Sequence, residues 1–414
     1  MVFAHTNCRL CKSADLEQFL DLGAQPPANA FLRKEDFAQE EKYPLRIGIC
    51  KNCFFVQLMD VVDPDTLFKE YLYVSSTSPL FVRHFEDYAR FIDDRFRVKS
   101  GLVVDIGSND GILLKSFQAL GANILGIDPA HAIAEKATKE GIPTMTGYFT
   151  EDIARAIARK HGKAKVITAN NVFAHIHDLD EVMRAVRALL LRDGVFVIEA
   201  PYLAVFLEDR LFDTIYHEHL SYIALTPLVS FFAKYGMEII DVEKVSSHGG
   251  SVRIMIGEKG AHRADARVAR YIDEEKNKGL QNIETYKKFA AEVLENRRLL
   301  VELLHELKKA GKRVVGYGAP AKGNTLLNFM RIGPDVVEYI VDDSPLKQGL
   351  FTPGMHIPVV SQEQLKGDHP DYVFILAWNF ADAIMKKNEE FNKKGGKFII
   401  PVPVPRIVDS ASSL

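Results

Sequence analysis

The sequence of 414 residues is longer than one ordinary hydrophobic core supports, and roughly two to four domains are expected. Its composition, 47% hydrophobic and 26% charged, is typical of a globular protein, and its net charge of -3 argues against a general affinity for nucleic acid or anionic membranes. The amino terminus has no apolar signal core, and no apolar run reaches about 18 residues. We therefore expect a cytoplasmic, monomeric protein with neither nucleic acid nor a membrane as a partner.

The first segment carries all four cysteines of the chain as two C-x2-C pairs, Cys8 with Cys11 and Cys50 with Cys53. One such pair lets two thiolates hold an ion, and two pairs complete a tetrahedral zinc site. Two unrelated redox or buried thiol pairs are the alternative. Because so small a module buries little core, structural Zn²⁺ would stabilise it. We therefore predict a zinc-binding module over residues 1–75.

From about residue 80 the pattern changes to alternating helix and strand, which we assign to a domain over residues 76–245. The amphipathic helix "FVRHFEDYARFIDDRF" precedes the buried strand "LVVDI", a tight glycine turn and the helix "ILLKSFQALG". Further strands are expected at "ILGIDPA", "KVITAN" and "VFVIEAP". Elements that alternate at this spacing predict a doubly wound parallel sheet.

The turn after the first of these strands, "VVDIGSNDG", is similar to the first motif of S-adenosylmethionine-dependent methyltransferases, here spaced D-x-G-x-x-x-G. It contains Asp105, Gly107, Asn109 and Gly111. Glycine lets the backbone approach a ligand, and the carboxylate can anchor the amino-acid end of the cofactor. Asp128, at the end of the next strand, is placed to accept hydrogen bonds from ribose hydroxyls. A nicotinamide fold is the alternative, although its G-x-G-x-x-G is absent.

Residues 246–414 are predicted to form a helical linker and a second α/β domain. Residues 265–310 have the pattern of a long charged helix or helix pair. "RVVGYGAPAKGNTLLNF" then predicts strand, glycine turn and helix, with later strands at "VEYIVDD" and "YVFILAWNF". The order G-K-[ST] of a Walker loop is missing, so an NTPase is not expected. Amides at a helix amino terminus and Lys322 would suit a diphosphate, and a packing turn that binds nothing is the alternative.

Four proton-handling side chains stand in a row in "YHEH", from Tyr216 to His219. A solvated strand end whose side chains bond one another is the structural alternative to a catalytic role. His175 and His177 in "HIH" add two more imidazoles. Together with the histidines of "YHEH" they could form a second metal site or line a wet groove.

Six motifs in order over nearly the whole chain resemble the sugar C-methyltransferases that act on nucleotide-linked 4-keto-deoxysugars, typically at C3. They are the cysteine pairs, "VVDIGSNDG", "YHEH", "HGGSVR", "GYGAPAKGN" and "LAWNF". The resemblance implies an α/β fold in which the zinc module and a carboxyl-terminal Rossmann-like domain flank the central domain, which binds S-adenosyl-L-methionine. It places the catalytic Tyr-x-Glu-His on Tyr216, Glu218 and His219, and an asparagine and a histidine that follow the fourth strand on Asn171 and His175.

The expected chemistry starts from the ketone, which acidifies the hydrogen on the adjacent carbon. Histidine can act as a base near neutral pH, so we expect His219 to take that proton, while Glu218 and Tyr216 orient the ring or contact the sugar. Asn171 and His175 would face the keto oxygen. Further contacts to the sugar nucleotide are expected from Tyr71, Tyr73, His248, Arg253, Lys322, Trp378 and Asn379. Two alternatives are an O-methyltransferase acting on a sugar or small metabolite and a non-catalytic zinc module on an inactive Rossmann scaffold.

Overall fold

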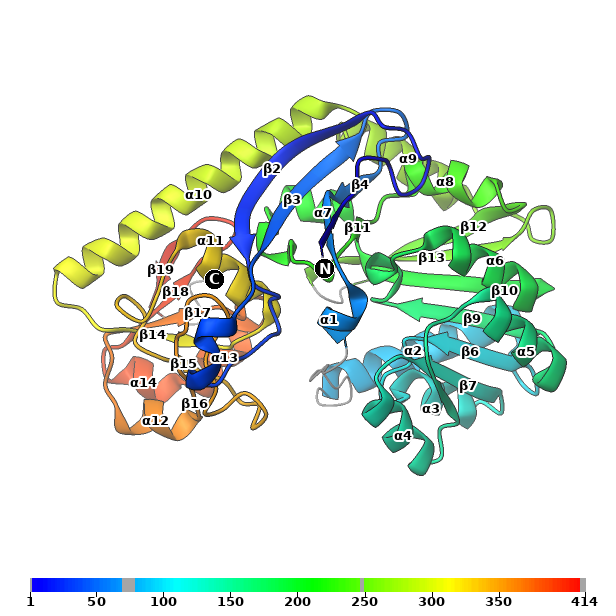
Figure 1. The fold of residues 1–414 in the computed structure, drawn as a ribbon. Coiled ribbons are helices and arrows are strands. Elements are labelled where there is room, and N and C mark those ends of the chain that lie inside the picture. Colours follow the sequence, from blue (N-terminus) through cyan, green and yellow to red (C-terminus); the bar gives the residue numbers. More distant parts are fainter. Residues whose placement is uncertain (1, 69–78, 246–248, 410–414) are drawn as a thin grey trace.

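The computed structural model describes residues 2–68, 79–245 and 249–409 and builds them on four sheets (Figure 1). Three residues predicted to contact the sugar, Tyr71, Tyr73 and His248, lie outside these ranges. In the described part of the chain, none of the helices has the length and apolar character needed to span a bilayer.

The zinc module is a four-stranded antiparallel sheet in the order β11-β4-β3-β2. Its strands are β2 (Leu16–Gln25), β3 (Tyr43–Cys50), β4 (Val56–Leu58) and β11 (Ser221–Tyr222). Beside it, β1 (Val2–Ala4) pairs with β5 (Asp60–Val62), and the loop from β2 to β3 contains the short 3-10 helix η1 (Lys34–Gln39). Because β11 begins two residues after His219, the candidate catalytic segment is tied to the zinc module by hydrogen bonds.

The central domain is a seven-stranded sheet in the order β12-β13-β10-β9-β6-β7-β8. Five strands are parallel, and they are β6 (Leu102–Ile106), β7 (Asn123–Asp128), β8 (Thr144–Thr146), β9 (Ala164–Asn170) and β10 (Leu190–Pro201). Helices α2 (Pro79–Phe96), α3 (Ile112–Ala119) and α4 (His131–Lys139) precede α5 (Glu151–His161), α6 (Leu179–Leu189), α7 (Leu203–Glu208) and α8 (Leu225–Ala233).

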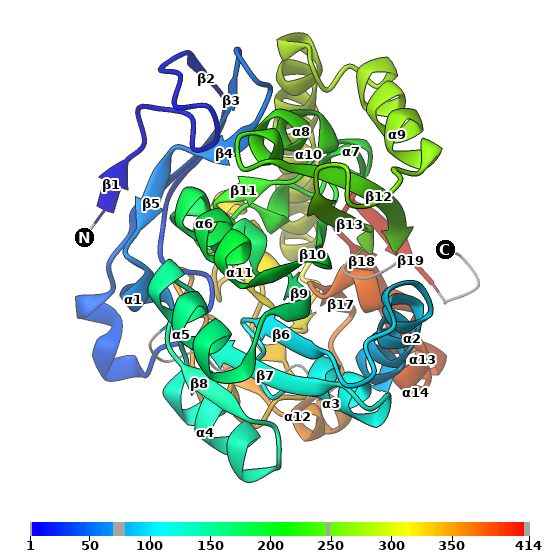
Figure 2. The same ribbon diagram turned by 90° about the vertical axis from the view of Figure 1, so that its right-hand side faces the viewer.

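Helices lie on both sides of the central sheet (Figure 2), and both of its faces are buried, as a doubly wound sheet requires. Val104 and Ile106 pack into one apolar cluster together with Val182 of α6 and Ile157 of α5. Val103, which points to the other face, packs with residues of α2 and α3 in a second cluster. This alternation explains why β6 is apolar except for its one carboxylate, and the predicted fold class is confirmed.

The central sheet continues past the domain boundary predicted at residue 245. Strands β12 (Met237–Val245) and β13 (Ser251–Glu258) form an antiparallel pair, and β13 also pairs antiparallel with β10. No strand was predicted for these residues. Residues 251–258 complete the central sheet through their hydrogen bonds with β10 and β12.

The carboxyl-terminal half begins with the expected helix pair, α9 (Ala266–Asn277) and α10 (Ile283–Lys309). Figure 1 shows α10 running beside β2 from the central domain to the last domain, and Tyr286 of α10 packs on Phe19 of β2. The last sheet has the order β16-β15-β14-β17-β18-β19, in which only β19 is antiparallel. Its elements are β14 (Val314–Tyr317), α11 (Ala321–Met330), β15 (Ile340–Val341), β16 (Val359–Val360), α12 (Gln362–Gly367), β17 (Tyr372–Ile375), α13 (Ala381–Lys387), α14 (Glu389–Lys393), β18 (Lys397–Ile400) and β19 (Arg406–Val408).

Candidate active site

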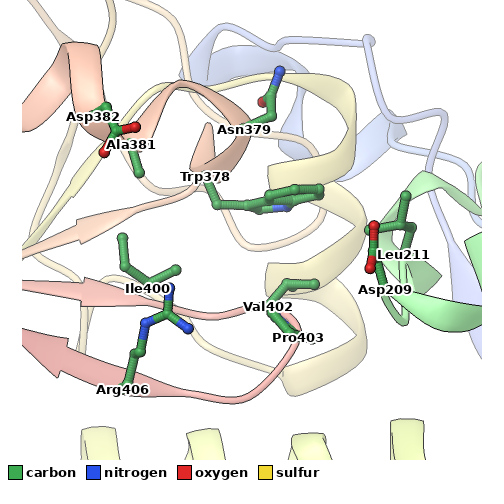
Figure 3. A pocket seen from close by; sticks show the side chains of 10 residues that line it. All are labelled: Asp209, Leu211, Trp378, Asn379, Ala381, Asp382, Ile400, Val402, Pro403 and Arg406. Atoms are coloured by element: carbon green, nitrogen blue, oxygen red, sulfur yellow. The ribbon is translucent and has the colours of Figure 1, made fainter. Parts of the chain in front are cut away.

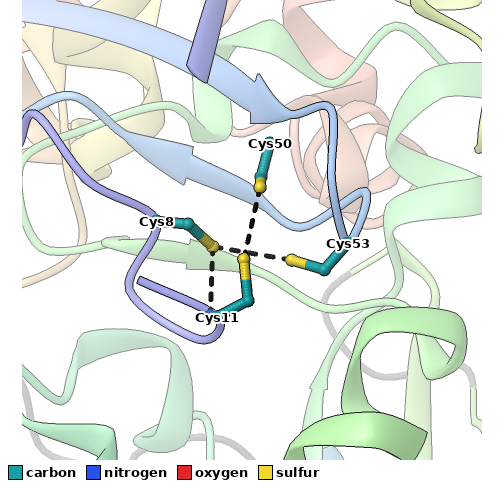
Figure 4. A group of neighbouring side chains, drawn as sticks. All are labelled: Cys8, Cys11, Cys50 and Cys53. Carbon is teal, nitrogen blue, oxygen red and sulfur yellow. Dashed lines mark hydrogen bonds between the residues drawn. The ribbon is translucent and has the colours of Figure 1, made fainter. Parts of the chain in front are cut away.

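The four cysteines converge from two chain turns into one cluster (Figure 4). The Sγ atoms of Cys8 and Cys53 and those of Cys11 and Cys50 are 3.5 Å apart, and all four lie within 4.8 Å of one another. A tetrahedral zinc with Zn–S bonds of about 2.3 Å places its sulfurs about 3.8 Å apart. The amide of Cys11 and the side chain of Asn52 also donate to cysteine sulfurs. The donor set and spacing fit one zinc ion.

The turn after β6 can be built only with glycine at two positions. Gly107 and Gly111 have φ angles of +65° and +75°, in the left-handed region. A Cβ on Gly107 would lie 2.4 Å from a methyl group of Val172, and one on Gly111 would lie 2.6 Å from Ile142. Without side chains at these two positions, the backbone of the turn can approach a ligand closely. The turn lies at the carboxyl edge of the sheet, where open α/β sheets bind their ligands.

Two buried carboxylates stand at this edge. Asp128 accepts backbone hydrogen bonds of 2.8 Å from Asn109 and Ala130, which tie the end of β7 to the turn after β6. Asp105 accepts a 2.6 Å hydrogen bond from Thr168 Oγ1. Burial, together with the charge of Asp128, raises the pKa of Asp105 to about 7. Both carboxyl groups therefore suit a cofactor that brings positive charge.

Buried polar atoms at the same edge have unmet hydrogen-bonding capacity. Within the described residues, Ser108 Oγ, Asn170 Oδ1 and Asn171 Oδ1 have no hydrogen-bond partner. Asn171 also has a φ of +54°, and its amide donates to the carbonyl of Glu199 at 2.7 Å. Buried polar groups are almost always satisfied in folded proteins. A ligand with amino and hydroxyl groups, such as S-adenosylmethionine, fits this edge.

The ring of His219 is held by the chain turn in front of it. Its Nδ1 lies 2.8 Å from the carbonyl oxygen of Thr214, at the end of the 3-10 helix η4 (Phe212–Thr214). A carbonyl only accepts, so the neutral ring carries its proton on Nδ1 and its lone pair on Nε2. The ring centroids of Tyr216 and His175 lie 4.0 and 4.9 Å from that of His219. The structure therefore brings the predicted base, its tyrosine and the second histidine together.

Glu218 and His217 of "YHEH" bond to other parts of the molecule. Glu218 is 3% exposed and its Oε1 accepts a 2.6 Å hydrogen bond from Asn29 Nδ2. Burial raises the pKa of Glu218 to about 7. His217 instead points its Nε2 at the carbonyl oxygens of Pro44 and Tyr43, at 3.2 and 3.3 Å. In the described chain the only metal-ligand cluster is that of the cysteines, so the second metal site is not formed.

The loop from β2 to β3 joins "YHEH" to the last domain. Asn29 of this loop binds Glu218, and the carbonyl of the preceding residue, Ala28, accepts a 2.8 Å hydrogen bond from Asn324 of α11. Three chain segments that are far apart in the sequence therefore meet beside the candidate base. Sequence reasoning missed Asn29, because nothing in "PPANAF" distinguishes it from an ordinary turn residue.

The residues predicted to bind the nucleotide lie in the last domain, beside a pocket that it forms with the central domain. A pocket of about 320 Å³ is lined by Trp378, Asn379, Asp209 and Leu211 among others (Figure 3). Next to it, Lys322 donates to Asn379 Oδ1, and its Nζ lies 4.0 Å from the Trp378 ring centroid. Burial lowers the pKa of Lys322 to about 8. Lys322, Trp378 and Asn379 are therefore neighbours, as the sequence predicted.

An unexpected hydrogen bond connects this pocket with the turn that precedes the candidate base. The indole Nε1 of Trp378 donates to Asp213 Oδ2 at 2.6 Å. Asp213 is buried in η4, immediately before Thr214, whose carbonyl holds His219. The last domain thus contacts the turn that orients the candidate base.

Arg253, predicted to contact the sugar nucleotide, is engaged with carboxylates of the protein itself. It is 4% exposed, and its guanidinium forms ion pairs of 2.8 Å with Glu199 and 2.6 Å with Glu243. It also stacks on Tyr88 of α2, with Cζ 3.8 Å from the ring centroid. Burial would raise the pKa of Glu199, but His84 and Arg253 lower it to about 2. Arg253 is a structural cation between strands and α2.

One amide of the glycine turn in the last domain is bonded within the protein. The amide of Ala319 donates to Asp342 Oδ2 at 2.7 Å. Lys347 lies 3.9 Å from the same carboxylate. The amide of Ala319 is therefore taken up by a carboxylate of the protein itself.

Three family profiles match the chain: a zinc binding domain over residues 8–68, a methyltransferase domain over residues 81–242 and a C-methyltransferase C-terminal domain over residues 246–403. The C-methyltransferase NovU of Streptomyces niveus is 37% identical over 410 residues, covering 98% of each chain. The ubiquinone biosynthesis O-methyltransferase of Cupriavidus pinatubonensis is 26% identical over 152 residues, 34% of this chain and 61% of the relative. The solved magnesium protoporphyrin IX methyltransferase of Synechocystis with bound SAH aligns with 43% of this chain and 83% of its own, at 14% identity and a TM-score of 0.34.

Proposed function

Because the chain belongs to the family of S-adenosylmethionine-dependent C-methyltransferases with a zinc-binding module, we propose that it methylates C3 beside the ketone of a nucleotide-linked 4-keto-deoxysugar. S-adenosylmethionine is its cofactor and zinc its structural metal. The observation that carries the proposal is the His219 ring, held through Nδ1 by a carbonyl and adjacent to His175 at the sheet edge.

His219 acts as the base in this proposal. The Thr214 carbonyl keeps the proton of the neutral ring on Nδ1, so Nε2 takes the proton from the carbon beside the ketone. The same carbonyl then stabilises the imidazolium, because its oxygen accepts from a positively charged donor. Tyr216 packs on the ring and limits its rotation.

The electrons released by this step move onto the ketone oxygen and give an enolate. Asn171 and His175 stand at the carboxyl edge of β9, where they would donate to that oxygen. Asp105 and Asp128 would help to hold S-adenosylmethionine, whose methyl group would pass to the enolate carbon as the S–CH3 bond breaks and S-adenosylhomocysteine leaves. The protein contributes by holding the substrate carbon next to His219 while Asn171 and His175 face the ketone oxygen.

The last domain binds the nucleotide in this proposal. Lys322 and the pocket beside Trp378 and Asn379 give a cation and an aromatic surface, which suit a diphosphate and a base. Because Asp342 occupies the glycine turn, the diphosphate would depend on Lys322 rather than on the turn amides.

The test uses a panel of 4-keto nucleotide sugars with S-adenosylmethionine, and the products are weighed by mass spectrometry. A mass gain of one methyl on the ketones, and none on sugars whose keto group has been reduced, is expected. Equal methylation of the reduced sugars would instead indicate an O-methyltransferase, the activity named for a relative that matches the central domain.

A substitution at His219 tests its proposed role as the base. His219→Asn cannot accept the proton, so methylation should fall by about 10²- to 10⁴-fold while cofactor binding, measured by calorimetry, stays the same. The matched control is His305→Asn, which changes an exposed histidine of α10 and should leave the rate unchanged. A His219→Asn variant that keeps more than about a tenth of the wild-type rate would exclude His219 as the base.

A further inference from the structure

Arg9 lies inside the first cysteine pair, and its side chain reaches the two chain segments that carry His175 and His219. It is 5% exposed, and its backbone amide donates to Gln57 Oε1 at 2.7 Å, which anchors it to β4. Its guanidinium donates through Nη1 to Ser221 Oγ and through Nη2 to two backbone carbonyls, those of Ile176 and of His177, the latter at 2.9 Å.

These three partners belong to the two segments that carry the candidate catalytic histidines. Ile176 and His177 directly follow His175, and Ser221 comes two residues after His219. One planar guanidinium therefore spans both segments, whose imidazole centroids are 4.9 Å apart. The fork geometry of arginine suits several simultaneous acceptors, which a lysine ammonium cannot reach in the same arrangement.

The charge of Arg9 relates its three hydrogen bonds, referred to below as the Arg9 clamp, to the zinc site. Among the described residues no carboxylate forms an ion pair in contact with Arg9, although the charge of Asp178 acts on it, and its buried Nε has no hydrogen-bond acceptor. A buried cation without a counter-charge in contact is costly. Four thiolates around one Zn²⁺ leave a net charge of about -2 next to Arg9, and this charge would compensate the guanidinium.

We propose that Arg9 is a positioning residue that couples the zinc-loaded cysteine cluster to the two catalytic histidines. The metal would hold the turn from Cys8 to Cys11 and balance the charge of Arg9. Arg9 would in turn fix the position of the segment after His175 relative to the segment after His219. The zinc module then takes part in setting the geometry of catalysis as well as supporting the fold. The inference rests on the proposed roles of the two histidines.

The experiment compares Arg9→Met with a matched control in the second cysteine pair. Lys51 occupies the same position in "CKNC" as Arg9 does in "CRLC", but it is exposed and pairs with Asp15 at the surface. Arg9→Met should lower kcat at least about tenfold, since misplacement of about 1 Å can cost 10²-fold, and should keep the zinc content and the cofactor dissociation constant. Lys51→Met should change none of these.

A spectroscopic measurement reports the clamp itself. In protein with isotope-labelled histidine, Arg9→Met should shift the NMR signals of the His175 and His219 rings and leave that of the exposed His305 in place. Arg9→Lys keeps the charge without the fork, so it should recover part of kcat and decides the question if the methionine variant does not fold.

Two results would overturn the inference. One is a folded Arg9 variant with kcat within twofold of wild type and unshifted imidazole signals. The other is a loss of zinc in parallel with the loss of kcat, which would mean that Arg9 only stabilises the zinc-binding turn from Cys8 to Cys11. A failure of the proposed role of His219 would look different. His219→Asn would then keep its methylation rate, while Arg9→Met in the otherwise wild-type protein would still shift the ring signals of His175 and His219.

Discussion

The hydrogen bond between Trp378 and Asp213 gives the sharpest test of how the last domain supports the base. Trp378→Phe keeps a ring over Lys322 but removes the Nε1–H that donates to Asp213 Oδ2 at 2.6 Å. Asp213 is fully buried, and its Oδ1 has no partner among the described residues, so few donors remain for this carboxyl group. The perturbation is therefore one lost charge-assisted hydrogen bond in a buried site.

The expected magnitude follows from that loss. Hydrogen bonds to charged groups contribute about 1.5–3 kcal/mol, and we expect Trp378→Phe to lower the free energy of unfolding by this amount. Because Asp213 adjoins Thr214, whose carbonyl orients His219, kcat should also fall by about tenfold, equivalent to about 1.4 kcal/mol of misorientation. Asp213→Asn should cost less, since the amide oxygen can still accept from the indole.

Urea unfolding followed by circular dichroism, together with initial methylation rates, measures both effects. Phe380→Leu is the control, because Phe380 belongs to the same 3-10 helix as Trp378 but is exposed; a change below about 0.5 kcal/mol is expected. In the double variant of Asp213 and Trp378 the two costs should not add, since both single changes weaken the same bond. Fully additive costs, or a Trp378→Phe variant as stable and active as the control, would refute the reasoning.

Four further outcomes are expected. Cys50→Ser should lose bound zinc, as measured by metal analysis, and full retention would contradict the four-cysteine site. Asp128→Ala should weaken S-adenosylmethionine binding at least about tenfold in calorimetry, and undiminished binding would exclude the ribose contact. Lys322→Ala should raise KM for the nucleotide sugar and leave cofactor binding unchanged, and unaltered kinetics would move the diphosphate elsewhere. Finally, burial raises the pKa of Glu218 from its ordinary 4.5 to about 7, so its stabilising protonated form is lost as pH rises through 7. Relative to Glu218→Gln, the wild type should lose about 3 kcal/mol of unfolding free energy between pH 4 and 8, and a constant difference would refute the shift.

The sequence by itself determined the parts of this protein whose signals are local. The spacing of Cys8, Cys11, Cys50 and Cys53 predicts the zinc cluster, because a C-x2-C turn brings two thiolates together wherever it occurs. The strand, glycine turn and helix around Gly107 follow from a few adjacent residues and their backbone conformations. The family resemblance, confirmed over 98% of the chain, rests on such motifs in order.

Only the tertiary structure decided which distant side chains meet. Glu218 and its partner Asn29 are 189 residues apart in the sequence, and Asp213 and Trp378 are 165 apart. Arg253 stands in a motif that predicted substrate contact, yet β13 pairs with β10 and buries it against Glu199. Such contacts leave no periodicity or spacing in the sequence, because they arise where separately formed elements pack against one another.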